Sequence, residues 1–577
     1  MYEREAYAGT EQRLVLAFDL GTIFSGVSYC ILNPGVVPEI EGVNRYPAHQ
    51  EYVGRNCKIP SVIYYDQYDV PRACGAETLQ PSVVDEAEEH GWVKVEWFKL
   101  HLRPKTMKAF APETILPSLP GAKLACEVLA DFFGYLFRCA RTYIQEAHDE
   151  IRWETLEDNI HFVFSHPNGW GGPQQKVLRK AAVLSKLIAD DEAGHFRMQF
   201  VTEGEASLNY CIHQGFVPTG ASTQFVSKGA IVVDAGGGTI NMSAYSLLPR
   251  DMRFEEIAES QCVFQGSAFV TQRAKSFFQA EFMDSSMEGD IPQMVEAFDK
   301  LAKVTFANET SMAYVKFGRL RDNDPKRNVR NGKLAISGSR VAGFFRPSFD
   351  AIMDAIVIQI EKARSKEHIT VVYLVGGFAA SEWLFRSLSE HLRFLGITVF
   401  RPDKHSSKAV ADGAVSFYID KFVKSRIAKH TYGLSTGVLY NPNNPEQLGR
   451  TLQNGICGLN SDYGAFSTVL SKGSTVQQSS EARTRHWSHA VQTDGLDSIK
   501  VNVYEFSGES EAPRWMDRNT DFKTAFTVRA DTKNFRNKYW RSFQMILVFE
   551  AAELKAQVCW IADGKEVRSP AQIIYHD

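Results

Sequence analysis

Three glycine-bearing segments, each attached to an apolar run, constrain this chain more than any other feature. They are Leu14–Thr22, Ile231–Thr239 and Val371–Gly377. Each pattern predicts a buried strand that runs into a tight turn, where backbone N–H groups can close around an anion. Asp19 and Asp234 each lie two residues before the first glycine of their segment. The pattern therefore predicts a site for phosphate and a metal ion between two related halves.

The two aspartates and the turns after them suit a magnesium nucleotide. We expect Asp19 and Asp234 to face Mg²⁺ through bound waters, because Mg²⁺ gives up its hydration shell reluctantly. Donors in the turns would hold the β- and γ-phosphates, since preplaced donors are the main catalytic device in phosphoryl transfer. The geometry of a turn after a strand is enough to explain a single glycine. Three successive glycines, Gly236 to Gly238, favour phosphate binding instead. The expected donors are Gly21, Thr22, Gly236, Gly237, Gly238 and Thr239.

Length predicts more than one domain, because 577 residues are too many for a single core. We expect an α/β nucleotide-binding domain over residues 13–425, with two lobes that are discontinuous in sequence. One lobe takes about 13–228 and 405–425, and the other about 229–404. After about Thr431, apolar and polar residues alternate, which predicts a smaller β-rich domain over 426–577.

Hydrophobic periodicity predicts the individual elements. Two strands flank the turn at Gly21, and further strands are expected at 159–164 and Val371. In the tail, strands are expected around Ile499–Val503, Phe526–Ala530 and Phe543–Phe549, and a final pair is joined across residues 563–564, a hairpin signal. Helices are expected over 124–150, 174–187, 268–282, 291–305, 347–364 and 408–423.

Composition argues against several classes of function. A formal net charge of −4 gives no electrostatic reason to expect nucleic acid. No apolar run approaches the roughly 20 residues that cross a bilayer, and the charged N-terminus has no apolar signal core, so no membrane contact is expected. Nine cysteines without any C-x-x-C pair indicate neither a zinc site nor a disulfide framework. Reduced thiols favour the cytoplasm.

Four motifs follow one another along the chain: Phe18–Ser25, Phe200–Ala206, Val233–Thr239 and Val375–Ala379. Together they resemble the ATPase domain shared by actin, sugar kinases and the seventy-kilodalton heat-shock (DnaK-type) chaperones. The heat-shock family matches best, and the last motif is closest to its divergent protein-twelve-like branch. The resemblance covers roughly residues 13–425, and weakly the tail. It implies a two-lobed actin-like (ribonuclease H-like) fold, ATP or ADP with Mg²⁺, and a reduced substrate-binding module.

The resemblance also implies catalytic roles. Lys99 is similar to the lysine that positions the attacking water beside the γ-phosphate. Glu203 resembles the carboxylate that organises the metal waters, and Glu205 competes for that role. Asp234 and Thr239 would complete the catalytic set.

Further residues would bind the nucleoside or move the lobes. Gly376 and Gly377 would let adenine approach the backbone, and Asp299 with Lys303 would lie one helical turn apart beside it. In an isolated sequence such an i,i+4 pair is more often a surface ion pair. Pro167 resembles a hinge that couples nucleotide state to lobe rotation, although it equally suits the end of a strand.

Several positions depart from the family pattern. Ile23 and Phe24 replace a threonine and a tyrosine, which removes two hydroxyls near the phosphates. Asn241 replaces an aspartate, and a neutral amide cannot take a proton from water. Residues 378–380 lack the arginine that stacks on adenine, and 421–426 lack the apolar acidic linker between domains.

The sequence therefore predicts Mg-dependent ATP binding with slow hydrolysis and nucleotide-gated binding of a polypeptide client or co-chaperone. Two alternatives stay open. One is a nucleotide-binding scaffold without turnover, which the departures at Ile23, Phe24 and Asn241 favour. The other is a small-molecule kinase, which would need a catalytic aspartate for which the sequence offers no separate candidate.

Overall fold

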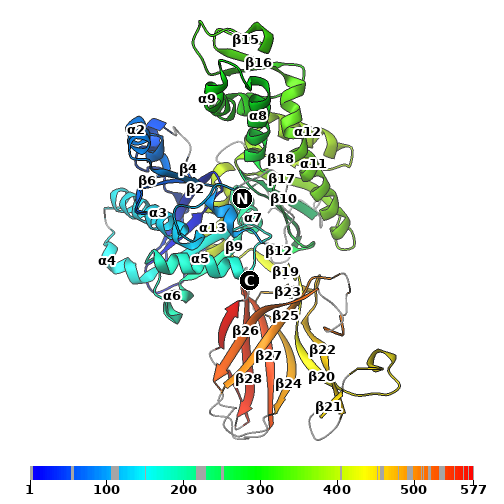
Figure 1. The fold of residues 1–577 in the computed structure, drawn as a ribbon. Coiled ribbons are helices and arrows are strands. Elements are labelled where there is room, and N and C mark those ends of the chain that lie inside the picture. The colour runs from blue at the N-terminus through cyan, green and yellow to red at the C-terminus, as the bar shows by residue number, and fades with distance from the viewer. Residues whose placement is uncertain are drawn as a thin grey trace. The chain divides into compact units, whose positions relative to one another are not determined.

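The protein forms two compact units, Met1–Trp170 with Val177–Val423, and Gly171–Lys176 with Lys424–Asp577 (Figure 1). The predicted mixed α/β class is confirmed. The predicted lobe boundaries near 228 and 404 fall at residues outside the described part of the chain. The computed structural model describes residues 4–52, 57–104, 116–149, 151–215, 229–248, 253–402, 406–450, 452–454, 460–478, 480–489, 498–508, 510, 513–516, 521–531, 540–550, 553–562, 564–568 and 571–575.

The first sheet of unit 1 carries the first glycine turn at the end of its central strand. Its order is β3-β2-β1-β8-β9, and β4 also pairs with β2. Strand β1 is antiparallel to β2, which places Asp19 opposite Gly26, and parallel to β8. The strands predicted around Gly21 and at 159–164 are confirmed. Their bounds are β1 Arg13–Asp19, β2 Phe24–Leu32, β3 Glu41–Gly42, β4 Ile59–Pro60, β8 Ile160–His166 and β9 Met198–Thr202.

The second sheet carries the other two glycine turns. Within unit 1 its order is β18-β17-β10-β11-β12, and β13 pairs with β11. Strands β10 and β11 are antiparallel, so Asp234 lies opposite Asn241, and β10 is parallel to β17. The strand expected at Val371 is confirmed. The bounds are β10 Gly229–Ala235, β11 Ile240–Leu248, β12 Arg253–Glu256, β13 Gln261–Val263, β17 Ile369–Val375 and β18 Thr398–Phe400.

Two helices pack between these sheets. Helix α13 (Ala409–Asp420) lies on β1, and α7 (Glu203–His213) lies on β10. The helices touch each other at Gly413, where an added Cβ would overlap the carbonyl of Ala206. This packing connects β1, which carries Asp19, with β10, which carries Asp234.

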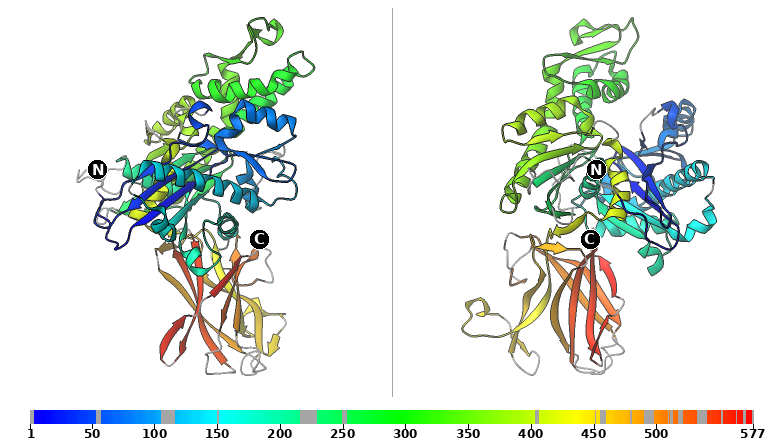
Figure 2. Two further views of the ribbon diagram at one scale, coloured as in Figure 1. Left: turned by 90° about the vertical axis from the view of Figure 1, so that its left-hand side faces the viewer. Right: turned by 180° about the vertical axis from the view of Figure 1, so that it is seen from behind.

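The second sheet shares one apolar core with α8, α9, α11 and α12, the green helices of Figures 1 and 2. The helix predicted over 347–364 instead begins at Gly338, with Ser337 as its N-cap, and contains Pro347. That start was predicted wrongly because proline removes only one intrahelical bond, which this long buried helix tolerates. The helices around this core are α8 Ser267–Phe282, α9 Ile291–Ala297, a π-helical turn Phe298–Ala302, α10 Lys303–Thr305, α11 Gly338–Ala363 and α12 Glu382–Arg393.

The remaining elements of unit 1 are helices and two small sheets, β6-β5-β7 and β14-β16-β15. The helix predicted over 124–150 is α3, and the helix predicted over 174–187 is α5, which begins at Gly172 in the segment Gly171–Lys176 assigned to unit 2. No described helix is both long and apolar enough to cross a membrane. Their bounds are α1 His49–Tyr52, β5 Val62–Tyr65, β6 Pro71–Cys74, α2 Pro81–Glu89, β7 Val93–Glu96, α3 Ala125–Ala147, α4 Trp153–Leu156, α5 Gly172–Leu184, α6 Glu192–Phe196, β14 Met312–Lys316, β15 Val329–Arg330 and β16 Lys333–Ser337.

Unit 2 is built from two antiparallel sheets, the yellow to red strands of Figure 2. One has the order β21-β22-β20-β25-β26-β30 and the other β24-β27-β28-β29, and their inward side chains form one apolar core. The alternating strands predicted after Thr431 are confirmed as β25 to β28. Strands β28 and β29 pair as predicted, although residue 563 lies outside the described residues. The bounds are β20 Thr431–Leu439, β21 Leu452–Asn454, β22 Asn460–Leu470, β24 Glu481–His489, β25 Ser498–Phe506, β26 Phe522–Asp531, β27 Trp540–Glu550, β28 Glu553–Ala562, β29 Lys565–Arg568 and β30 Ala571–Tyr575. Strands β19 Val423–Ile427 and β23 Thr475–Gln477 belong to neither sheet and pair with each other.

Candidate functional site

The turns after β1 and β10 lie against each other. An added Cβ on Gly237 would lie 2.8 Å from Ile23 Cδ1, and one on Gly238 would lie 2.9 Å from Thr22 Cβ. Thr22 is buried, as is Thr239 at the end of the second turn. The prediction that these two turns meet is confirmed.

The second turn presents its backbone amides on one side. The carbonyls of Gly236, Gly237 and Gly238 accept hydrogen bonds from the amides of residues 267, 268 and 266, at 3.1, 2.9 and 3.3 Å. In a trans peptide the C=O and the next N–H point in opposite directions. The N–H groups of Gly237, Gly238 and Thr239 therefore point away from the start of α8.

The first turn is held by serines. The Gly21 amide donates to Ser25 Oγ at 3.1 Å, and Ser61 Oγ donates to the Gly21 carbonyl at 2.8 Å. The two hydroxyls lie 2.7 Å apart. The Gly21 amide, expected as a phosphate donor, is thus engaged within the protein, and Thr22 is the residue of this turn closest to the second one.

Three buried carboxylates gather beside the turns: Asp19 at the end of β1, Glu203 at the start of α7 and Asp234 near the end of β10. Thr202 caps α7 by accepting from the Glu205 amide, which fixes where Glu203 begins the helix. Burial, followed by the charges of Glu203 and Asp19, raises the pKa of Asp234 well above its usual value. The cluster therefore carries negative charge that is not fully compensated.

Asn241 links two of these carboxylates. Its Nδ2 donates to Glu203 Oε2 at 2.5 Å and to Asp234 Oδ2 at 3.4 Å. Its Oδ1 accepts from the backbone amide of Asn168 at 2.9 Å. These three hydrogen bonds fix the side-chain amide of Asn241. An aspartate at position 241 would instead add negative charge beside Asp234.

Two lysines neutralise the other carboxylates. Lys99 Nζ lies 2.5 Å from Glu203 Oε1, with both side chains buried, and 5.6 Å from the Trp170 ring centroid. Lys58 Nζ lies 2.5 Å from Asp19 Oδ2. Burial alone would lower the pKa of Lys58, but the charge and hydrogen bond of Asp19 outweigh it and the pKa is raised.

Sequence reasoning did not find Lys58, because its place depends on the pairing of β4 with β2. No local pattern predicts that pairing. The same holds for Ser61, which follows β4, and for Asn168, whose Nδ2 donates to the Met242 carbonyl at 3.0 Å. These residues become part of the site only through contacts between distant segments.

The third glycine turn touches the second. Gly376 has a φ of +91°, and an added Cβ would lie 2.5 Å from both the Ala235 carbonyl oxygen and Asp234 Oδ1. Gly377 faces open space. Pro167 follows β8, and its carbonyl accepts from the Trp170 amide at 3.0 Å.

Asp299 and Lys303 form an ion pair, joined by Thr271 of α8. Lys303 Nζ also donates to Thr271 Oγ1 at 3.1 Å. Thr271 in turn lies 3.5 Å from the Ser267 carbonyl, one helical turn from the residues that hold the second glycine turn. The pair is connected to the site through the start of α8.

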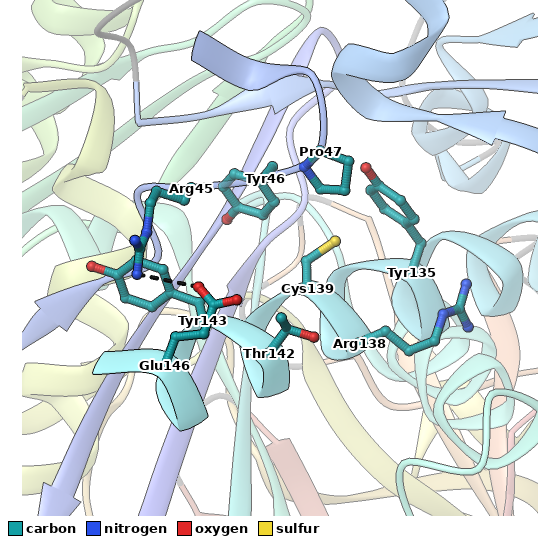
Figure 3. Close-up of a pocket in the computed structure, with 9 residues that line it drawn as sticks. All are labelled: Arg45, Tyr46, Pro47, Tyr135, Arg138, Cys139, Thr142, Tyr143 and Glu146. Carbon is teal, nitrogen blue, oxygen red and sulfur yellow. Dashed lines mark ion pairs between the residues drawn. The ribbon is translucent and has the colours of Figure 1, made fainter. Parts of the chain in front are cut away.

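A separate cavity of about 350 Å³ lies between the segment after β3 and helix α3 (Figure 3). Arg45 and Glu146 form an ion pair of 3.4 Å across its mouth. None of the residues predicted for the site lines it. Within the described residues, no group of three or more His, Cys, Asp or Glu side chains is arranged to hold a metal ion.

Comparison with known proteins gives two weak similarities. The heat shock 70 kDa protein 12A of Mus musculus is 22% identical over 506 residues, which cover 74% of this chain and 72% of that protein. The heat shock 70 kDa protein 12B of Homo sapiens is 22% identical over 506 residues, covering 74% and 71%. No protein-family model matches the chain. The similarity supports the predicted resemblance to the protein-twelve-like branch.

Proposed function

We propose that residues 13–425 form a two-lobed, actin-like domain that binds ATP or ADP, with the phosphates held between the turns after β1 and β10. The contact of Thr22 with Gly238 supports this arrangement, because both turns can reach one ligand. The weak similarity to two heat shock 70 kDa proteins points to the same class. Gly376, Gly377, Asp299 and Lys303 remain the residues proposed beside the nucleoside.

The observation that carries the proposal is the direction of the peptide groups in the second turn. Three successive carbonyls are bound by residues 266–268, so three successive N–H groups face the opposite way. Successive amides that share one direction form a concave site for an anion. A phosphate group fits this chemistry, and Thr22 and Thr239 would add hydroxyls.

Magnesium is the ion we propose beside the nucleotide, through waters held by Asp19 and Asp234. The donor chemistry fits, because Mg²⁺ prefers carboxylate oxygens and keeps several waters. The pKa of Asp234 is raised first by burial and then by the charges of Glu203 and Asp19, and these charges favour a nearby cation. When bound, the ion would neutralise charge on the phosphate oxygens.

Slow hydrolysis is the proposed chemistry. Lys99, held by Glu203 at 2.5 Å, would orient the attacking water. Asn241 holds Glu203 and Asp234 but cannot take a proton from water, so the chain lacks a strong base at this position. A scaffold that binds nucleotide without turnover is the alternative that this amide favours.

Unit 2 is proposed to hold a polypeptide in response to the nucleotide, as a reduced substrate-binding module and thus as a chaperone. This step rests on resemblance, which is a weaker argument than the site. A cytoplasmic location goes with it, because the cysteines show no disulfide spacing.

Calorimetric titration with ATP, ADP and AMP in Mg²⁺ tests nucleotide binding. We expect ATP and ADP to bind and AMP to bind at least about tenfold more weakly, since it lacks the phosphates that the turns would hold. Gly238→Val should abolish binding by filling the space beside Thr22. Gly289→Val, at a glycine with open space around it, is the matched control. Absence of heat with ATP, or equal loss in both variants, would overturn the proposal.

Single-turnover hydrolysis beside Asp234→Asn separates enzyme from scaffold. A rate above that of the variant supports turnover, and equal background rates leave only binding. Phosphoryl transfer to sugars would instead favour the kinase alternative.

A further inference from the structure

Lys58 is placed in the carboxylate cluster by the fold of the first sheet. Strand β4 pairs with β2 so that Ile59 lies opposite Ser25. The stem of Lys58 then crosses Gly26, where an added Cβ would lie 3.1 Å from Lys58 Cγ. Gly26 lies opposite Asp19 in the register of β1 and β2. The missing side chain at Gly26 thus leaves the path by which Lys58 Nζ reaches Asp19 Oδ2.

The ammonium is almost enclosed at this position. The Lys58 side chain is 14% exposed and the Asp19 side chain 4%. A buried charge pair of this kind persists only when both partners stay in place, because either charge alone would be strongly disfavoured. Lys58 is therefore a fixed cation at the carboxylate that would otherwise be available to a metal ion.

The charges of the cluster are unevenly shared. Lys99 is paired with Glu203 and Lys58 with Asp19, whereas Asp234 faces the neutral Asn241. A divalent ion that approached Asp19 would have to share that carboxylate with the ammonium or displace it. Like charges so close together repel strongly in a poorly solvated site.

We propose that Lys58 is a built-in counter-ion for the bound phosphates, so that this chain still holds a nucleoside triphosphate when Mg²⁺ is removed. This inference rests on the proposed function, because it assigns a partner to the same two turns. A lysine ammonium is a compact charge on a flexible stem and binds phosphate well. Lys58 stays paired with Asp19 and supplies positive charge beside the phosphate oxygens.

The first test is calorimetric titration of ATP into the full chain, with Mg²⁺ and with EDTA. For the wild type we expect the two dissociation constants to differ by less than about threefold. For Lys58→Gln we expect ATP affinity in EDTA to fall by at least about tenfold and to recover when Mg²⁺ is added. A wild type that loses tenfold or more in EDTA overturns the proposal, as does an equal loss by the variant in both conditions.

The matched control is Lys123→Gln. Lys123 forms a partly buried ion pair with Asp131 at 2.6 Å, and its ammonium lies 4.9 Å from the Tyr65 ring centroid. It has a similar setting but lies outside the carboxylate cluster. We expect its ATP affinity to match the wild type in both conditions, and a loss like that of Lys58→Gln would contradict a specific role for Lys58.

A second test uses Mg²⁺ alone and needs no nucleotide. The melting temperature of the wild type should not change with Mg²⁺, whereas that of Lys58→Gln should rise as Asp19 becomes free to hold the ion. A wild type stabilised by Mg²⁺ as strongly as the variant counts against the inference. If Lys58→Gln does not fold, Lys58→Arg, which keeps the charge, should retain binding in EDTA, and its loss there overturns the idea. Failure of ATP to bind the wild type in either buffer would instead refute the proposed function.

Discussion

The turns after β1 and β10 share a sequence pattern but place their aspartates in opposite surroundings. Asp19 faces the ammonium of Lys58 at 2.5 Å. Asp234 faces the neutral amide of Asn241 at 3.4 Å and has a raised pKa. The same motif thus produces one compensated and one uncompensated carboxylate.

The difference arises from the residue across the strand pair. Opposite Asp19 stands Gly26, which leaves room for a side chain from another segment. Opposite Asp234 stands Asn241, whose own side chain fills that place. The strand-turn motif determines the backbone, and the cross-strand residue determines the charge.

The largest expected effect comes from removing the charge of Asp19, the carboxylate that Lys58 compensates. Asp19→Asn leaves the Lys58 ammonium buried without its partner, and we expect the free energy of unfolding to fall by about 3–5 kcal/mol. Urea denaturation measures it. The double variant Asp19→Asn with Lys58→Met should recover most of the loss, since it removes both charges. No recovery would mean that the pair is not a unit.

A smaller effect should follow from placing an extra methyl group beside Asp234, the uncompensated carboxylate. Gly376→Ala imposes a positive φ on alanine and brings its Cβ to 2.5 Å from Asp234 Oδ1. We expect a loss of about 1–3 kcal/mol in unfolding free energy. Gly396→Ala, with a φ of +73° but open space around it, separates the effect of strain from that of contact. Equal losses in the two variants would show that the approach to Asp234 contributes nothing.

Adding a second carboxylate beside Asp234 tests directly whether negative charge there is uncompensated. Asn241→Asp removes the donor to Glu203 and Asp234 and adds like charge, so we expect a loss of about 1–2 kcal/mol near neutral pH. Its pKa in the folded state would be raised, so the loss should shrink as pH falls and the new carboxyl takes up a proton. Chemical denaturation at several pH values measures this. A loss that stays constant with pH would exclude repulsion as its cause.

The sequence predicted those parts of the site that depend on neighbouring residues. Both turns and the spacing of Asp299 with Lys303 follow from local pattern. Helix α7, which begins at Glu203, was not predicted. Lys58 could not be predicted, because a pairing between separate segments positions it. The predicted start of α11 at 347 was wrong, because the hydrogen bond lost at Pro347 is outweighed by the buried apolar face of that helix.

The smallest expected effect is that of Asp234→Asn, and its sign should be opposite to that of Asp19→Asn. The folded-state pKa of Asp234 lies above the ordinary value of an aspartate, so ionisation of Asp234 favours unfolding. The protonated carboxyl therefore stabilises the fold below the ordinary pKa of an aspartate, and this contribution is lost as pH rises through the folded-state pKa. Asp234→Asn carries no charge, so at neutral pH it should be slightly more stable than the wild type, with the difference vanishing in acid. Urea unfolding of the wild type and Asp234→Asn between pH 4 and 7 measures the difference in unfolding free energy. At neutral pH this difference should have the opposite sign to that caused by Asp19→Asn. A variant less stable than the wild type at every pH would show that Asp234 is compensated after all.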